Sequence, residues 1–313
     1  MSDAVFRDNL ALAQPVAPPA ARKKRDSSAP TAALLLAPSL LFLALFTYAP
    51  ILQALTQAFT IEKFGGKFAG YGFGNFQRLF FDAAFQKAFA NTFLYGIGTV
   101  APSLVIAVIL AAALQESTRF NNLLRTIFFF PTLLPLVAAA ALGSFVLMPG
   151  AGLLDYYLAQ LGAAQTNWLG DPDIALYSII GLTIWKNAGY YMLFALAGLQ
   201  GIPSDIHEAA KLDGAGPITR FFRITLPLLM PTLAVIVVIA LINVVTQVDH
   251  VIVLTGGGPS DSTNVLLNYI FQAAHEQHDI GRGAAATIVS VALLLALSFV
   301  SLKTLERGMH YES

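Results

Sequence analysis

Long stretches without a charged residue restrict how this 313-residue chain can fold more than any other feature. A transmembrane α-helix needs roughly 20 apolar residues to cross the hydrocarbon core of a bilayer. Five windows of at least that length contain no Asp, Glu, Lys or Arg: Ser27–Ile61, Ala88–Gln115, Thr126–Leu154, Ile224–Val248 and Gly283–Leu302. A sixth, Ile174–Leu199, carries one charge at Lys186. The pattern predicts an all-α integral membrane protein with six transmembrane helices.

The composition supports the same class. The chain is 56% hydrophobic and 12% charged, which leaves too few charges to cover a soluble globule of this size. Its formal net charge of zero argues against a nucleic-acid partner, since phosphates require a basic excess. The sequence has no Cys, so disulfides and thiolate metal sites are excluded.

Lys and Arg residues are divided unequally between the two sides of the predicted bundle. Twelve lie on the side that holds both termini and five on the other. Because positively charged loops remain in the cytoplasm, we expect both termini there. Residues 1–30 are rich in Ala, Pro and Ser and are interpreted as a disordered cytoplasmic tail. Residues 31–305 form the predicted six-helix domain, and residues 306–313 a second cytoplasmic tail.

The connection between the fourth and fifth predicted spans, residues 200–227, is the longest polar interruption in the C-terminal half. Asp205 and Glu208 have the spacing of a capping box, which predicts a helix that begins near Asp205. Gly214 is placed to stop that helix, and Pro217 to start another. An ordinary inter-helix loop is the alternative, but such loops usually span only a few residues. The length of this one therefore favours a functional role.

Within this loop the sequence resembles a known motif. Glu208-Ala209-Ala210, then Gly214 four positions later, then Ile224 with Leu226-Pro227 is similar to the EAA motif of ABC importer permeases, the inner-membrane components of binding-protein-dependent transport. Trp185, the segment Ala195–Gln200 and the Thr-Gly-Gly-Gly-Pro run after the fifth span resemble the carbohydrate-importing branch, which includes permeases of the maltose and glycerol-3-phosphate type. The resemblance is clearest over residues 91–307.

The resemblance implies a type I importer bundle in the inner membrane of a bacterial cell, with the Glu208 helix as a cytoplasmic coupling helix that docks on a separate ATPase. It also implies four partners besides membrane lipid: a second homologous permease, two ATP-binding subunits and an external solute-binding protein. ATP and Mg would be bound by the ATPase subunits, and this chain would bind no cofactor. The residues assigned to ATPase coupling are Glu208, Ala209, Ala210, Gly214, Arg220, Arg223, Ile224, Leu226 and Pro227.

Polar residues inside two predicted spans are candidates for a substrate path. An intramembrane charge such as Lys186 usually faces a bundle interior or a water path, and helical spacing would put Asn243, Thr246 and Asp249 or His250 on overlapping faces. A structurally paired lysine and interhelical hydrogen bonds are the alternative interpretations. The predicted path residues are Lys186, Asn187, Tyr190, Asn243, Thr246, Gln247 and Asp249.

No other pattern indicates catalysis. His275, Glu276 and His278 lie close together, but such residues in an external loop are more often solvent-exposed than metal ligands, so no metal site is expected. The sequence contains no Gly-x-x-x-x-Gly-Lys-Ser/Thr loop, so the chain is not expected to hydrolyse ATP and is not an enzyme. We expect a permease subunit that imports a sugar or a related polyol or glycerol phosphate by alternating access. The alternatives are an ion-gradient-driven secondary transporter and a non-transporting membrane anchor.

Overall fold

A computed structural model of the chain describes residues 29–63 and 67–306. It consists of two compact units, residues 1–52 and 53–313, which are described separately. Of the predicted cytoplasmic tails, residues 1–28 and 307–313 lie outside the described residues.

The first unit is helical throughout its described part. Helix α2 (Ala29–Leu43) passes through a π-helical turn (Ala44–Tyr48) into α3 (Ala49–Phe59), which ends in the second unit. Ala32–Phe59 is long and apolar enough to span a membrane. Its apolar side chains are exposed, as Leu34 (75%) and Phe46 (71%) illustrate. An exposed apolar surface of this kind suits contact with lipid or with another membrane segment. The first predicted span is confirmed as a helix.

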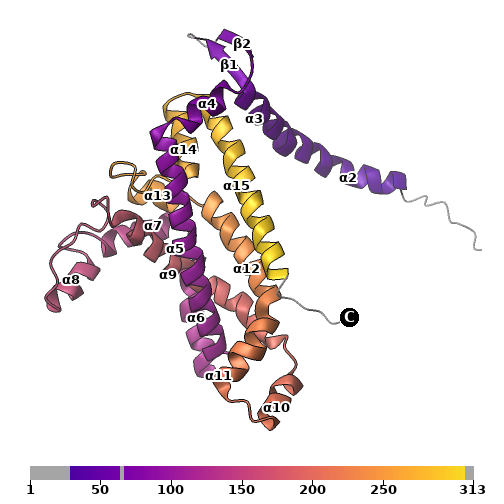
Figure 1. Ribbon diagram of the computed structural model, residues 1–313, viewed down its shortest axis with the longest axis vertical. Helices are drawn as coiled ribbons and strands as arrows, with labels where there is room; N and C mark the ends of the chain where they lie inside the picture. The colour runs from indigo at the N-terminus through magenta and orange to yellow at the C-terminus, as the bar shows by residue number, and fades with distance from the viewer. Residues whose placement is uncertain (1–28, 64–66, 307–313) are drawn as a thin grey trace, which may run out of the picture. The chain divides into compact units, whose positions relative to one another are not determined.

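The second unit is a bundle of long helices (Figure 1). Its long elements are α5 (Ala83–Ala113), α6 (Arg119–Leu133), α7 (Leu136–Val146), α9 (Ala175–Gln200), α12 (Leu226–Thr246) and α15 (Ile280–Glu306). Helix α5 packs along α9, and α12 packs against α5, α9 and α15. The predicted all-α membrane class is confirmed.

Length and hydropathy identify the membrane spans among the described residues. Four helices qualify by themselves, and the pair α6–α7 would make a fifth span if its two halves are counted together. Helix α9 has 26 residues, or roughly 39 Å at 1.5 Å per residue, which is also sufficient to span a bilayer. It contains Asn187, three tyrosines and, near its middle, the charged Lys186.

Two of the predicted spans are broken rather than continuous. The expectation of one helix through Thr126–Leu154 is wrong, because α6 and α7 meet at an angle of 101°. Pro131 lies inside α6 and Pro135 is the N-cap of α7, and proline lacks the N–H that would continue a helix. The expectation that helical spacing continues from Asn243 to Asp249 or His250 is also wrong, because α12 ends at Thr246 and a separate α13 (Asp249–Leu254) follows.

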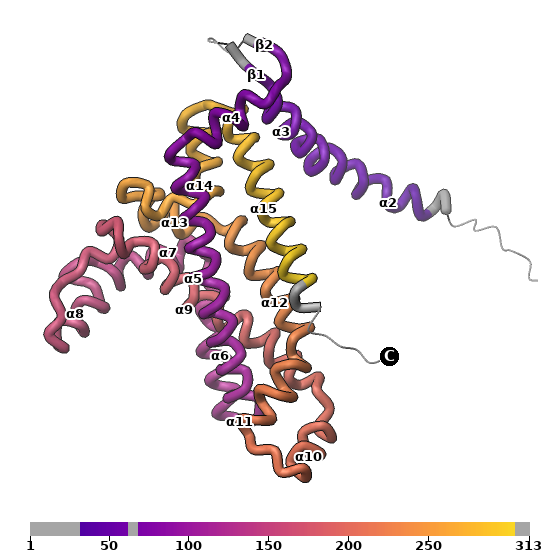
Figure 2. The backbone as a smooth tube through the Cα atoms, viewed as in Figure 1, coloured from indigo at the N-terminus to yellow at the C-terminus, as the bar shows by residue number. Residues whose placement is uncertain are grey.

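Short elements connect the spans, and all but α8 lie at the end of the bundle opposite α10 (Ser204–Leu212) and α11 (Pro217–Arg220) (Figure 2). After α3, the strands β1 (Thr60–Lys63) and β2 (Lys67–Tyr71) pair antiparallel. The buried Asn75 side chain donates to the carbonyls of Ala58 (3.0 Å) and Thr60 (2.8 Å), and so satisfies groups left free where α3 ends. The remaining connecting helices are α4 (Gly74–Phe80), α8 (Leu153–Gln160) and α14 (Leu266–Phe271).

The connecting segments are held by ionic contacts. Arg282, at the start of α15, lies 3.0 Å from the carboxylate of Asp82, which caps the N-terminus of α5. In the loop around α8, the buried Asp155 carboxylate accepts from the Gly150 N–H and from Trp168 Nε1, both at 2.7 Å. These two donors hold the pKa of Asp155 below its ordinary value, because they stabilise the ionised form.

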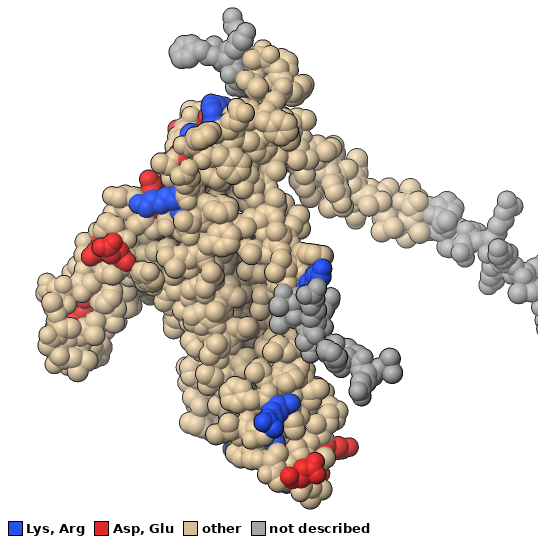
Figure 3. Space-filling view, in the orientation of Figure 1, with Lys and Arg blue, Asp and Glu red and all other residues tan. Residues whose placement is uncertain are grey.

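The charged residues of the second unit are distributed as expected for a protein that spans a bilayer. In Figure 3, charged side chains gather at the end that carries α10 and around the opposite end, and the face between them is mostly uncharged.

Small residues let the helices of the second unit approach closely. A Cβ on Gly98 would lie 2.8 Å from Ile180 Cδ1, so α5 and α9 are in contact at that point. The largest cluster of buried residues lies among α5, α9 and α12.

Candidate functional site

The first candidate site is the loop between α9 and α12, which forms one end of the second unit (Figure 2). It contains α10 (Ser204–Leu212) and α11 (Pro217–Arg220). Gly214 adopts φ +77°, the Ala215 N–H donates to the Ala210 carbonyl (3.0 Å), and the Gly214 N–H donates to Lys211 (3.0 Å). This bonding pattern ends a helix on a left-handed residue, usually glycine. The predicted helix stop at Gly214 is confirmed.

Two other expectations for this loop are wrong. The helix expected near Asp205 does begin there, at Ser204, but the expected capping box does not form: α10 has no side-chain cap, and the Ser204 hydroxyl lies 3.4 Å from the Asp205 carboxylate. The helix at Pro217, expected to be a second short helix within the loop, is much longer. It starts at Pro217 as predicted, but α11 continues through a π-helical turn into α12, so that Pro217–Thr246 is one helix of 30 residues. A force on the loop would therefore be transmitted directly along a membrane-spanning helix.

The surface of this loop has the composition of an interface. The Glu208 side chain is exposed, and among the described residues no ion pair involves it, Arg220 or Arg223. Two large apolar side chains are exposed beside these charges, Leu212 at 90% and Ile218 at 74%. Unpaired charges next to exposed apolar residues are typical of surfaces that bind another protein.

The remaining residues of the predicted motif divide between surface and interior. Ala209 is exposed on α10 and Ala210 is buried against the chain itself. The later positions belong to the junction with α12, where Ile224 and Leu226 are half-buried and Pro227 is exposed. The structure thus brings one part of the motif to the surface and uses the other to fix the start of α12.

The second candidate site is a polar cavity of about 330 Å³ that is open to the surface of the bundle. It opens between the bend of α6–α7, the middle of α9 and the break between α12 and α13. The residues that line it are Thr132, Leu136, Lys186, Asn187, Tyr190, Asn243, Gln247 and Asp249. Six of the seven predicted path residues therefore meet around one space, although they come from three helices and the segment that follows α12.

Thr246 is the predicted path residue that lies elsewhere. Its side chain is exposed, and its hydroxyl donates to the Ile242 carbonyl of its own helix at 2.8 Å. The overlap expected for Asn243, Thr246 and Asp249 assumed a continuous helix. The break after Thr246 changes the direction of the following residues, so Asp249 lines the cavity and Thr246 does not.

Lys186 links two of the elements around the cavity. Its side chain is 7% exposed, and Nζ donates to the carbonyls of Thr132 (3.2 Å) and Leu134 (2.9 Å), which are free because the helix bends there. The Thr132 hydroxyl donates in return to the Lys186 carbonyl at 2.9 Å. Lys186 and Asp249 form no ion pair within the part of the chain that the structure describes. The lysine therefore has a structural partner as well as a place in the cavity wall.

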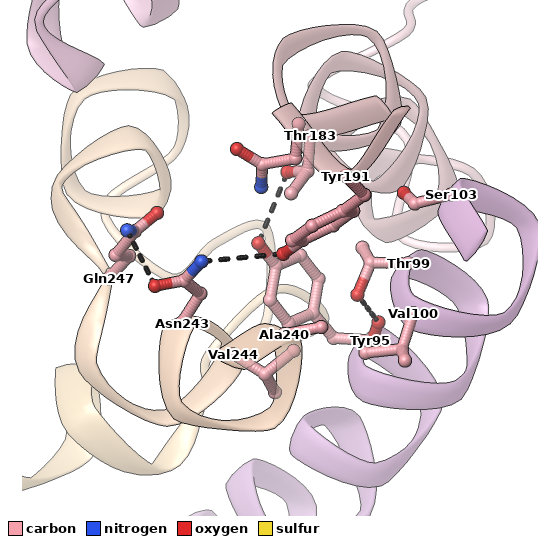
Figure 4. A pocket seen from close by; sticks show the side chains of 11 residues that line it. Tyr95, Thr99, Val100, Ser103, Thr183, Tyr191, Ala240, Asn243, Val244 and Gln247 are labelled. Carbon is pink, nitrogen blue, oxygen red and sulfur yellow. Dashed lines mark hydrogen bonds between the residues drawn. The ribbon is translucent and has the colours of Figure 1, made fainter. Parts of the chain in front are cut away.

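Amide and phenol groups continue the polar wall toward α5. Gln247 Nε2 donates to Asn243 Oδ1 at 3.0 Å, and Asn243 Nδ2 donates to Tyr191 Oη at 3.3 Å, as Figure 4 shows. Tyr95 and Thr183 lie beside them (Figure 4) and were missed in the sequence, because neither is charged and neither belongs to a recognisable motif. Their polarity inside a predicted span was the only available signal.

The cluster around His275 does not resemble a ligand set. The His275 ring stacks on Phe271, with centroids 4.8 Å apart. Within residues 29–63 and 67–306, no group of three or more His, Asp or Glu residues is placed to hold a metal ion.

Comparisons with known proteins agree on one family. The family model of the binding-protein-dependent transport system inner membrane component matches residues 103–311. The probable ABC transporter permease protein YurN of Bacillus subtilis is 33% identical over 280 residues, which covers 88% of this chain and 96% of that protein. The sn-glycerol-3-phosphate transport system permease protein UgpA of Yersinia pestis is 31% identical over 281 residues, with 89% and 95% covered.

Solved structures show the same fold. A chain of a bacterial ABC transporter involved in the import of the acidic polysaccharide alginate superposes with a TM-score of 0.78 at 26% identity, covering 90% of this chain and 96% of that one. A second structure of a bacterial alginate ABC transporter, in complex with an alginate pentasaccharide-bound periplasmic protein, gives a TM-score of 0.75 at 25% identity, covering 88% and 93%.

Proposed function

Since the chain belongs to the family of binding-protein-dependent transport system inner membrane components, we propose that it forms half of the translocation path of an ATP-driven importer. The other half would be a second, homologous permease. Two ATP-binding subunits would supply the energy, and an external solute-binding protein would deliver the cargo. The periplasmic protein bound to the related alginate transporter supports the last of these partners.

The observation that carries this proposal is the exposed surface of α10 and α11. Glu208 lacks an ionic partner among the described residues, and Leu212 and Ile218 are exposed beside it. A cleft on an ATPase subunit would cover the apolar side chains and offer partners to the charges. Because α11 continues into α12, motion of the ATPase would move a wall of the polar cavity and switch its access from one side of the membrane to the other.

The proposed orientation follows from the same surface. An ATPase that uses cytoplasmic ATP must meet α10 on the cytoplasmic side. The excess of Lys and Arg on the side of the termini supports this orientation, so both termini would be cytoplasmic. ATP and Mg would then bind to the partner subunits, and this chain would contribute no cofactor site.

The cavity wall favours a hydroxyl-rich cargo. Asn243, Gln247 and Tyr190 offer donors and acceptors, and the Asp249 carboxylate accepts hydrogen bonds from hydroxyl groups. Lys186 is the one cationic side chain in this wall, and its ammonium group already binds two carbonyls. We therefore propose a sugar or related polyol as the cargo, and we favour it over a glycerol phosphate, which Asp249 would repel.

Substitutions in the cavity wall test the proposed path. We expect Asn243→Leu and Lys186→Met each to lower ATP-driven uptake by about tenfold or more, because each removes hydrogen bonds worth roughly 1.5 kcal/mol or more in total. Thr246→Val is the matched control, since Thr246 lies on the same helix outside the cavity and should retain uptake. The measurement is uptake into proteoliposomes that contain equal amounts of assembled transporter. Full uptake by both cavity variants would show that this cavity is not part of the transport path, as expected if the chain only anchors the complex.

A further inference from the structure

A buried chain of hydrogen bonds connects three helices behind the polar cavity. Tyr95 of α5 places its hydroxyl oxygen 3.1 Å from Thr183 Oγ1 of α9 and 2.8 Å from His250 Nε2 of α13. The exposed fractions of the three side chains are 2%, 8% and 1%. Figure 4 shows the contact between Tyr95 and Thr183. These contacts connect the short α13 to α5 directly and to α9 through Tyr95.

The direction of each hydrogen bond can be assigned. The Thr183 hydroxyl donates its single proton to the Ile179 carbonyl, 2.8 Å away, so toward Tyr95 it can only accept. Tyr95 must then donate its own single proton to Thr183, and its oxygen is left to accept from His250 Nε2–H. Protons therefore point from His250 to Tyr95, from Tyr95 to Thr183 and from Thr183 to Ile179. This order needs all three members, and loss of one breaks it.

Among the described residues, His250 has one hydrogen-bond partner that could orient its ring. Its Nδ1 atom has no hydrogen-bond partner among the described residues, so the bond to Tyr95 is the polar contact that holds the ring. The ring also lies beside that of Tyr95, with centroids 5.7 Å apart. The imidazole thus has a polar partner on one side only, from α5, although α13 as a whole also packs against α7.

The position of His250 determines where Asp249 points. The two residues open α13, directly after the break that follows α12. Successive side chains on a helix are rotated by roughly 100°, so a histidine directed into the core turns the preceding aspartate toward the cavity. Val248 (7% exposed) and Val251 (0%), which flank this pair, are also buried. Because α13 has only 6 residues, its own backbone bonds resist rotation weakly.

We propose that Tyr95, Thr183 and His250 are positioning residues that fix the rotation of α13 and so hold Asp249 in the wall of the polar cavity. The use of Asp249 by a cargo rests on the proposed function, whereas the fixed rotation of α13 does not. The proposal therefore adds three residues outside the cavity wall to those that determine how the path is built.

The absence of Cys from the sequence allows a direct test. In the assembled transporter, Asp249→Cys would be the only thiol of this chain, and its rate of modification by a charged, membrane-impermeant thiol reagent reports whether position 249 faces water. We expect Tyr95→Phe and Thr183→Val to lower that rate by about fivefold, since each removes buried hydrogen bonds at nearly constant volume. Thr183→Ser keeps the hydroxyl and should restore the original rate.

Thr99→Val is the matched control for loss of a buried hydroxyl. Thr99 lies one turn from Tyr95 on α5, is 3% exposed, and donates only to backbone carbonyls of its own helix. Rates are compared at equal amounts of assembled transporter, and if Tyr95→Phe fails to assemble, Thr183→Val supplies the same test. An unchanged rate in the variants that assemble, or an equal loss in Thr99→Val, would overturn the proposal.

The same variants separate this inference from the proposed function. With Asp249 in place, we expect Tyr95→Phe and Thr183→Val to lower uptake by about fivefold, while Thr183→Ser and Thr99→Val transport normally. A changed modification rate together with normal uptake would uphold the positioning of α13 and contradict the role of the cavity in transport.

Discussion

Replacing Gly214 with valine should lower uptake by about tenfold or more while the permease remains in the membrane. Gly214 has φ +77°, and a Cβ added there would meet no atom within 4 Å. The cost is therefore backbone strain alone, at least about 1–2 kcal/mol for a residue with a side chain in the left-handed region. The loop can relieve that strain only by giving up the bonds that end α10, which would move Glu208 and Leu212 away from their positions on the surface.

Gly216→Val is a closely matched control for this prediction. Gly216 lies two residues further on, its φ is −64°, and a Cβ there also meets no atom within 4 Å. Any side chain can adopt that backbone conformation, so Gly216→Val should transport like the parent protein. Gly214→Asn should be intermediate, because asparagine tolerates the left-handed region. Equal uptake by Gly214→Val and Gly216→Val, at equal amounts in the membrane, would show that the shape of this loop does not matter for coupling.

Replacing Gly189 with alanine should sharply reduce the amount of folded protein. A Cβ on Gly189 would overlap the Phe128 carbonyl oxygen and lie 2.5 Å from its carbonyl carbon and 3.0 Å from the Phe129 Cα. All three atoms belong to the backbone of α6, so relief requires separation of α6 from α9. That movement would also weaken the hydrogen bonds from Lys186 to the carbonyls at the bend. We expect a destabilisation of about 3 kcal/mol or more, at the upper end of overpacking effects.

The control for this prediction is Gly181→Ala on the same helix. A Cβ at Gly181 meets no atom within 4 Å, and alanine is the better helix former, so this variant should be as stable as the parent. Both variants can be compared by the fraction that remains monodisperse in detergent after heating. Equal survival of Gly189→Ala and Gly181→Ala would mean that α6 and α9 do not pack as closely as described.

The membrane fold could be predicted from the sequence because it depends on a local property. The backbone N–H and C=O groups of a charge-free run of more than 20 residues can all be hydrogen-bonded in a bilayer only in a helix or a closed barrel. The start and stop signals at Pro217 and Gly214 also act locally. The breaks in two spans could not be predicted with the same certainty. Pro131 and Pro135 stand at the first break, but prolines are tolerated in membrane helices, and no Pro or Gly stands at the break after Thr246.

The candidate site was only partly predictable because it depends on contacts between distant residues. Lys186 could be singled out as a charge in an apolar helix, but its partners at Thr132 and Leu134 lie more than 50 positions away. Thr246 was misplaced because helical spacing was extended across a break. Tyr95 was missed because its importance comes from His250, which is 155 residues further along the chain.

The central claim is that this chain imports solute only when a separate ATPase acts on the surface of α10 and α11. The most direct measurement is solute uptake into proteoliposomes that hold the complete transporter and its solute-binding protein, with and without ATP and the ATPase subunits. The account predicts uptake with ATP and its loss when the ATPase subunits are omitted, whether or not a proton or sodium gradient is supplied. Uptake that persists without those subunits and follows such a gradient would contradict the account and identify a secondary transporter.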